Sequence, residues 1–70
     1  LSRHNLRGIL LGIVYQQSGT FTPEDVRQKL LTQTGNDVSV VSIYSFLRDL
    51  TEMAQSPLLY ENYHYSVRRR

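Results

Sequence analysis

The chain has 70 residues, no cysteine and 40% hydrophobic residues. A chain of this length buries only about 60% of the surface that its unfolded form exposes, so we expect one small domain and not a large enzyme with its own substrate cavity. Without cysteine, no disulfide or thiolate zinc site can hold it together, and packing must do so. The longest apolar run, Ile9 to Tyr15, is far too short to cross a membrane. We therefore expect a cytoplasmic protein that has no membrane partner.

The net charge of +2 is unevenly distributed. The last three residues, Arg68, Arg69 and Arg70, form a basic tail, whereas residues 1–67 carry five basic and six acidic side chains. A strong nucleic-acid binder usually displays a basic stripe on its folded body. The body of this chain is slightly acidic, so we expect its electrostatic attraction to phosphates to be weak.

The first predicted helix covers residues 5–17. Ser2 can cap its start, and Gly19 can follow its end, because glycine tolerates a left-handed conformation there. Gly8 and Gly12 either allow another backbone to approach closely or are small residues that the helix tolerates. The apolar residues at helical spacing are Leu6, Ile9, Leu10, Ile13 and Val14.

A second helix is predicted from Pro23 to about Thr34. Phe21 ends a stub of strand, and Thr22 then supplies a capping hydroxyl. Proline at the first helical position and two acidic residues after it suit the positive end of the helix dipole. Gly35 ends the helix. The residues expected to face inward are Val26, Leu30 and Leu31.

A third helix is predicted from a Ser39 cap to about Met53. The segment 38–41 is β-branched and also fits a strand, but the apolar period continues well beyond it and favours a helix. The predicted inward stripe is Val40, Ile43, Leu47, Leu50 and Ala54, with Phe46 at its edge. The predicted solvent face is Val41, Ser45, Arg48 and Glu52, flanked by Ser42, Tyr44 and Asp49.

Two short segments after Pro57 predict a β-hairpin. Leu58 to Tyr60 and Tyr63 to Val67 flank Glu61-Asn62, and asparagine accepts the positive φ that a two-residue loop needs. This register pairs Leu58 with Tyr65 and Tyr60 with Tyr63 on one side of the ribbon. Leu59 and His64 lie on the other side.

Three helices followed by a hairpin describe a mainly α, winged helix-turn-helix domain over residues 1–67, with a basic tail at 68–70. In DNA-binding domains of this kind the third helix enters the major groove and the hairpin forms the wing. The solvent face of the third helix is therefore the first candidate site.

The segment from Phe21 to Leu30 and the segment from Val38 to Leu47 together resemble the DNA-binding half of ferric uptake regulators. In the motif of the recognition helix, Ser39, Ile43, Tyr44 and Leu47 match. Ser42 replaces a threonine, Val41 replaces a small residue, and Ser45 stands where the family usually carries arginine. The resemblance implies a winged helix that binds DNA. The metal-sensing and dimerisation parts of that family have no counterpart here, since the chain has two histidines and no cysteine.

These patterns predict the DNA-binding domain of a transcriptional regulator. Tyr44 and Arg48 lie one turn apart, so tyrosine can contact a base or sugar and arginine can bind guanine or phosphate. Alternatively, Tyr44 packs against the wing and Arg48 pairs with Glu52. Ser39 at a helix start can cap the helix and approach a phosphate. The candidate DNA-binding residues are Ser39, Val41, Ser42, Tyr44, Ser45, Arg48, Arg3, Arg7, Arg68, Arg69 and Arg70.

The expected partner is double-stranded DNA, and a homodimer or a larger parent chain is implied because one small domain binds a half-site weakly. The alternative is a winged-helix module that binds another protein. A continuous positive face around the third helix favours DNA, whereas an apolar or mixed face favours a protein. No catalytic constellation, cofactor motif or metal-ligand spacing is present in the sequence, so we expect no enzyme, cofactor or metal.

The tyrosines of the hairpin have two interpretations. Tyr60, Tyr63 and Tyr65 are interleaved with His64, and such a row can stack on single-stranded bases. Cross-strand aromatic pairs also hold small ribbons together, and the sequence favours this second role.

Overall fold

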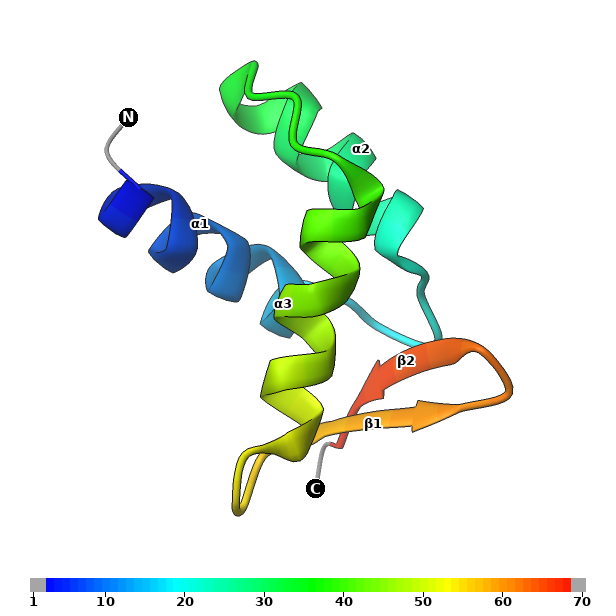
Figure 1. Cartoon of the computed structure of the whole chain (residues 1–70). Coiled ribbons are helices and arrows are strands. Elements are labelled where there is room, and N and C mark those ends of the chain that lie inside the picture. Colours follow the sequence, from blue (N-terminus) through cyan, green and yellow to red (C-terminus); the bar gives the residue numbers. More distant parts are fainter. Residues whose placement is uncertain (1–2, 69–70) are drawn as a thin grey trace.

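The computed structural model describes residues 3–68 and contains three helices followed by a two-stranded hairpin (Figure 1). This is the predicted order and fold class. The Ser2 cap and the tail residues Arg69 and Arg70 lie outside the described residues. The elements are α1 (Arg3–Gln16), α2 (Pro23–Thr34), α3 (Val40–Glu52), β1 (Leu58–Glu61) and β2 (His64–Val67).

The start and end of α2 follow from local chemistry. The Thr22 N–H donates to the Asp25 carboxylate (2.9 Å), and the Asp25 N–H donates to the Thr22 hydroxyl (3.2 Å). This reciprocal pair satisfies two donors that a helix start leaves without partners. At the other end Gly35 adopts a left-handed φ of 77° and donates its N–H to the Leu31 carbonyl, which is the usual way for glycine to end a helix.

The predicted inward stripe of α3 is correct at its centre and wrong at both ends. Ile43, Leu47 and Leu50 are buried, whereas Val40 is 37% exposed, because it lies at the edge of the stripe that these three define. Ala54 is exposed. The helix ends at Glu52 and the next residue is extended, so position 54 no longer follows the helical period.

One core joins all the elements. It is most tightly closed where Val14 of α1, Val26 and Leu30 of α2, and Ile43 and Leu47 of α3 meet, each with less than 2% of its surface exposed. The other buried hydrophobic residues are Leu10, Ile13, Phe21, Leu50, Leu58 and Tyr65.

A single bridge ties the hairpin to the link between α1 and α2. The main chains of Phe21 and Tyr65 exchange two hydrogen bonds of 2.8 Å, and their ring centroids lie 6.1 Å apart. The predicted strand stub at Phe21 is therefore present as this bridge. The hairpin projects from the C-terminal end of α3 past the start of α2 (Figure 1).

The predicted hairpin loop is wrong by one residue. The loop is Asn62-Tyr63, with φ values of 52° and 65°, and Tyr60 lies opposite Tyr65. Positive φ at both loop residues is the conformation whose twist matches that of the flanking strands. The observed register also brings the rings of Tyr60 and Tyr65 to a centroid distance of 4.9 Å. Tyr63 is consequently a loop residue and does not take part in the pairing of the two strands.

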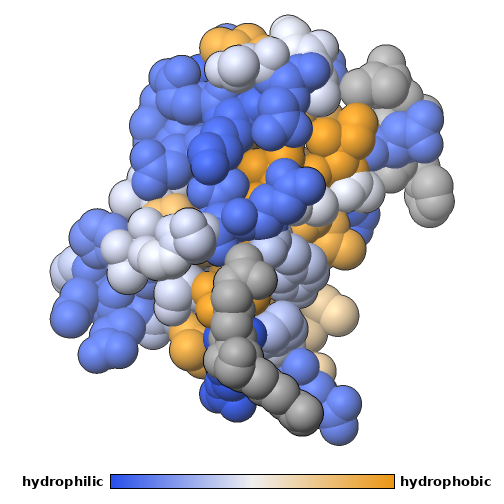
Figure 2. Space-filling model, turned by 180° about the vertical axis from the view of Figure 1, so that it is seen from behind, coloured by the Kyte–Doolittle hydropathy of each residue, from blue (hydrophilic) through white to orange (hydrophobic). Residues whose placement is uncertain are grey.

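Most of the surface opposite the view of Figure 1 is hydrophilic, with apolar side chains showing in separate patches (Figure 2). Nothing within the described residues comes within 4 Å of a Cβ placed on Gly8 or Gly12, so neither glycine serves a close backbone approach inside the domain. Among residues 3–68, no helix has the length and apolar character that a membrane span requires.

Candidate functional site

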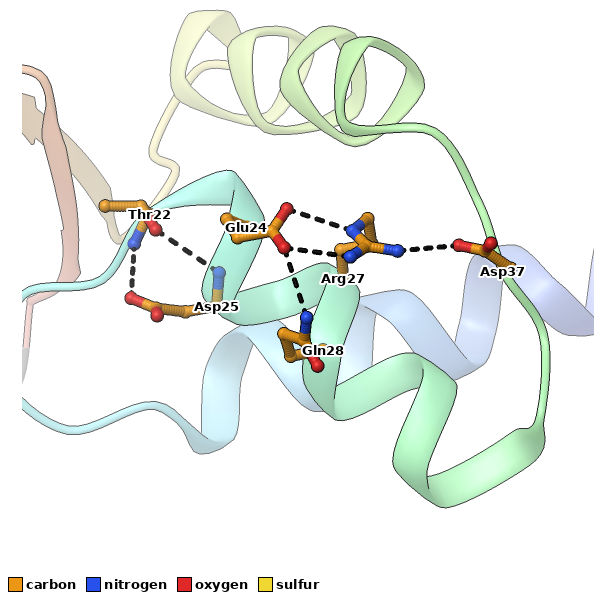
Figure 3. A network of polar contacts seen from close by, with 6 residues as sticks. All are labelled: Thr22, Glu24, Asp25, Arg27, Gln28 and Asp37. Carbon is orange, nitrogen blue, oxygen red and sulfur yellow. Dashed lines mark hydrogen bonds and ion pairs between the residues drawn. The ribbon is translucent and has the colours of Figure 1, made fainter.

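An ionic network fixes the turn that precedes α3 (Figure 3). The Arg27 guanidinium donates to both oxygens of Glu24 (2.9 Å each) and to the Asp37 carboxylate (2.7 Å). Glu24 also accepts a hydrogen bond from Gln28 (3.2 Å). These bonds stabilise the charged carboxylate, chiefly through Arg27, and lower the pKa of Glu24 to about 2. Because Asp37 belongs to the turn, the network links the start of α3 to α2.

The first turn of α3 is capped as predicted. The Ser39 hydroxyl accepts the N–H of Ser42 (3.1 Å) and donates to the Ser42 hydroxyl oxygen (2.9 Å). One of the two hydroxyl protons is therefore used between these side chains, and the other remains available for an outside acceptor. Both serines are exposed, so either hydroxyl can reach a ligand.

The solvent face of α3 combines apolar, polar and charged groups. Val41 is 75% exposed and Tyr44 is 44% exposed, and Arg48 is also exposed, as the sequence predicted. Asp49 and Glu52 are exposed towards the C-terminal end of the helix. The face is mixed in charge and not continuously positive.

A groove of about 380 Å³ lies between α1 and α3, along one edge of this face. Arg7 of α1 lines the groove. The Arg7 guanidinium carbon lies 5.4 Å from the centroid of the Phe46 ring, which is the geometry of a cation–π contact. Ser42 and Ser45 line the same groove. The full lining is Leu6, Arg7, Leu10, Val38, Ser42, Ser45, Phe46 and Asp49.

The other edge of the face lies near Tyr65, in strand β2 of the hairpin. Burial raises the pKa of the Tyr65 phenol, and the nearby Tyr44 and Tyr60 raise it further, while Arg48 partly opposes them. Tyr44 and Arg48 therefore lie close enough to Tyr65 to act on its charge. Within the described part of the chain, ion pairs join Arg27 to Glu24 and Asp37, and Arg48 does not pair with Glu52.

The remaining predicted DNA-binding residues lie away from this face or have side chains that the structure does not describe. Arg68 is exposed, and its main-chain N–H donates to the Pro57 carbonyl (2.7 Å) at the base of the hairpin. Arg3 begins α1, but its side chain falls outside the described residues, as do Arg69 and Arg70. The structure thus brings Arg7 together with the α3 residues and leaves Arg68 at the base of the wing.

Two features of the site were missed by sequence reasoning. The spacing of Glu24 and Arg27 is a readable signal for an i,i+3 pair, but the partner Asp37 lies ten residues further along. The stacking of Arg7 on Phe46 joins two helices that are distant in sequence, and no local pattern indicates it.

Comparison with protein-family models, with curated proteins and with solved structures finds no match to this chain. The resemblance to ferric uptake regulators consequently remains a prediction. Among residues 3–68, no group of three or more histidine, cysteine or acidic side chains is placed to hold a metal ion.

Proposed function

We propose that this chain is the DNA-binding domain of a transcriptional regulator, with α3 in the major groove and the hairpin as a wing. The observation that carries the proposal is the placement of two guanidinium groups. Arg7 lies over Phe46 in the groove between α1 and α3, and Arg48 is exposed on α3, where its charge acts on Tyr65 of the hairpin. The same face of α3 carries the small side chains of Ser42 and Ser45 and the exposed Val41.

Small side chains on that face of α3 let the helix backbone come close to base edges. The Ser42 hydroxyl donates to a base or a phosphate, the Val41 methyl groups contact a thymine methyl, and Arg48 binds guanine or a phosphate. Arg7, held near the Phe46 ring, binds a phosphate at the edge of the major groove. Asp49 and Glu52 repel phosphates, which limits contact to the part of the helix that ends at Arg48.

The small number of cations at this face sets the strength of binding. Each neutralised phosphate contributes about −0.9 to the slope of log affinity against log salt. With Arg7, Arg48 and Arg68 as the contributing groups, we expect a slope of about −3. Because a single domain makes so few phosphate contacts, we expect it to bind weakly. Tight binding then requires a homodimer or a longer parent chain.

The test is fluorescence anisotropy with a labelled random-sequence duplex pool. Arg7→Ala and Arg48→Ala should each weaken binding by roughly 1–3 kcal/mol if the side chain contacts the DNA. Lys29→Ala is the matched control, because Lys29 is an exposed cation on the outer surface of α2 with Gln28, Thr32 and Gln33. If all three variants lose the same amount of DNA affinity, the loss reflects the net charge of the protein and not a contact at this face. That result would contradict the proposal.

A second candidate function is supported by the apolar content of the same face. Val41 and Tyr44 on α3 are 75% and 44% exposed, and Tyr60 on β1 is 47% exposed, which is the mixed surface that favours a protein partner. In that case the duplex pool binds weakly, and Arg7→Ala and Arg48→Ala change nothing. Val41→Ser would then abolish capture of the partner protein while leaving the fold intact.

A further inference from the structure

The groove between α1 and α3 has an apolar floor that the core holds in place. Leu10 is buried, and Leu6, Val38 and Phe46 are half-buried hydrophobic residues packed against the core. The groove measures about 380 Å³, which is within the range of sites that bind small molecules, and such sites are mainly apolar with a few polar groups. Its floor is therefore a preformed surface for an apolar group of that size.

Two opposite charges line the same groove without pairing. The guanidinium carbon of Arg7 lies 5.4 Å from the centroid of the Phe46 ring. Asp49 is three residues beyond Phe46 in α3, which is about 4.5 Å further along the helix axis. Arg7 and Asp49 are both exposed, and the ion pairs among residues 3–68 are those of Arg27. Each charge is therefore open to a group that enters the groove.

The proposed DNA contact gives Asp49 no part to play. Its carboxylate repels phosphates, so DNA binding does not account for an acid in this groove. A zwitterion gains from both charges, because its carboxylate accepts hydrogen bonds from Arg7 and its ammonium group donates to Asp49. The hydroxyls of Ser42 and Ser45 line the same groove and are further donors for a carboxylate. The charges thus complement a zwitterion, and the floor complements an apolar substituent on it.

We propose that the groove between α1 and α3 binds a free α-amino acid with an apolar side chain, and that this amino acid competes with DNA. The apolar side chain packs on the floor, the carboxylate meets Arg7 and the ammonium group meets Asp49. Competition follows because Arg7 cannot hold the amino acid and a phosphate at the same time. The competition rests on the proposed function, whereas the binding of the amino acid does not.

The test compares four small probes. L-Phenylalanine is the full ligand, 3-phenylpropanoate lacks the ammonium group, phenethylamine lacks the carboxylate, and glycine lacks the apolar side chain. Binding is followed by NMR titration of isotope-labelled protein, in which the amide signals of nearby residues shift. L-Phenylalanine should bind with a Kd of the order of 1 mM, and each other probe about 3- to 10-fold more weakly. Equal binding of L-phenylalanine and 3-phenylpropanoate would overturn the proposal, because no ammonium group would then be recognised.

Two variants assign the charges of the ligand to their partners. Asp49→Asn should weaken L-phenylalanine about 3- to 10-fold and leave 3-phenylpropanoate no weaker. Arg7→Gln should weaken both carboxylates and leave phenethylamine unchanged. The matched controls are Glu52→Gln and Lys29→Gln, which remove exposed charges that do not line the groove and should bind every probe like the parent. Equal losses in Asp49→Asn and Glu52→Gln would overturn the site, and the amide spectrum shows that each variant is folded.

Competition is measured by fluorescence anisotropy with the random-sequence duplex pool. L-Phenylalanine at about ten times its Kd should lower the apparent DNA affinity of the parent about 10-fold, as mass action requires for exclusive binding. The amino acid is a zwitterion and adds no net charge, so the loss is not an effect of salt. Glycine at the same concentration should leave the affinity nearly unchanged, and Asp49→Asn should lose less affinity than the parent does.

The outcomes distinguish this inference from the proposed function. If L-phenylalanine shifts no amide signal of the groove, the amino-acid site is overturned, whether or not the parent binds the duplex pool. If L-phenylalanine binds and the parent binds no duplex, the site is supported and the proposed function is overturned. If both bind and L-phenylalanine leaves the DNA affinity unchanged, the competition is overturned, since the two ligands then occupy different surfaces.

Discussion

The helix-turn-helix and the hairpin of this domain are held in place by different physics. The helix-turn-helix, α2 with α3, is defined by contacts close in sequence: the Thr22–Asp25 capping box, the Ser39 cap and the Gly35 end. The hairpin has few local determinants and depends on two buried side chains, Leu58 and Tyr65, the second of which packs near Phe21. Local determinants are individually replaceable, whereas a shared tertiary contact is not. Loss of the Tyr65 side chain should therefore cost far more than loss of any one of these caps.

The largest expected effect is that of Tyr65→Ala. Tyr65 is 3% exposed and packs against Phe21 and Tyr60, so truncation should cost about 3–5 kcal/mol of unfolding free energy, measured by urea denaturation. Tyr44→Ala is the control from α3. Its ring is 44% exposed, and its loss should cost no more than about 0.5–1 kcal/mol. If Tyr44→Ala proves as damaging as Tyr65→Ala, its ring is part of the core and the proposed DNA-binding face is wrong.

A smaller effect is expected when one cap of the helix-turn-helix is removed. Thr22→Ala eliminates the hydroxyl that accepts from the Asp25 N–H and should cost about 1 kcal/mol, again by urea denaturation. Thr32→Ala is the matched control, since this exposed threonine lies inside α2 and does not cap it. Alanine has the higher helix propensity there, so stability should hold or rise slightly. A cost for Thr22→Ala near that of Tyr65→Ala would erase the contrast between the two regions.

The same contrast explains how much of the fold could be predicted from the sequence. Both ends of α2 and the Ser39 cap were predicted correctly, because capping residues act on neighbours a few positions away. The hairpin was predicted, but its loop was placed one residue too early. Asn62 accepts positive φ in either loop, and what selects the observed register is the packing of Tyr65 on Tyr60 and Phe21, which is a tertiary contact.

The candidate site divides along the same line. The outward direction of Tyr44 and Arg48 follows from the helical period and was predicted. The neighbours of these residues were not: Arg7 reaches α3 only because α1 packs beside Phe46, and Arg48 acts on the charge of Tyr65 in the hairpin and does not pair with Glu52. Sequence reasoning therefore identified most of the residues on the face and missed the contacts that hold them.

The smallest expected effect concerns the ionic network between α2 and the turn before α3. Hydrogen bonds from Arg27 lower the pKa of Glu24 to about 2 from an ordinary value of 4.5. A carboxyl group whose pKa is lower in the folded state stabilises the fold above pH 4.5, and this contribution is lost as the pH falls towards 2. The charges are exposed, so water and salt screen them and the contribution is small.

Glu24→Gln lacks the titrating group, so its stability should fall less than that of the parent between pH 5 and pH 2, as measured by urea denaturation along an acid series. The difference should shrink in high salt, and parallel curves for the two proteins would show that the network orients the turn without stabilising the fold.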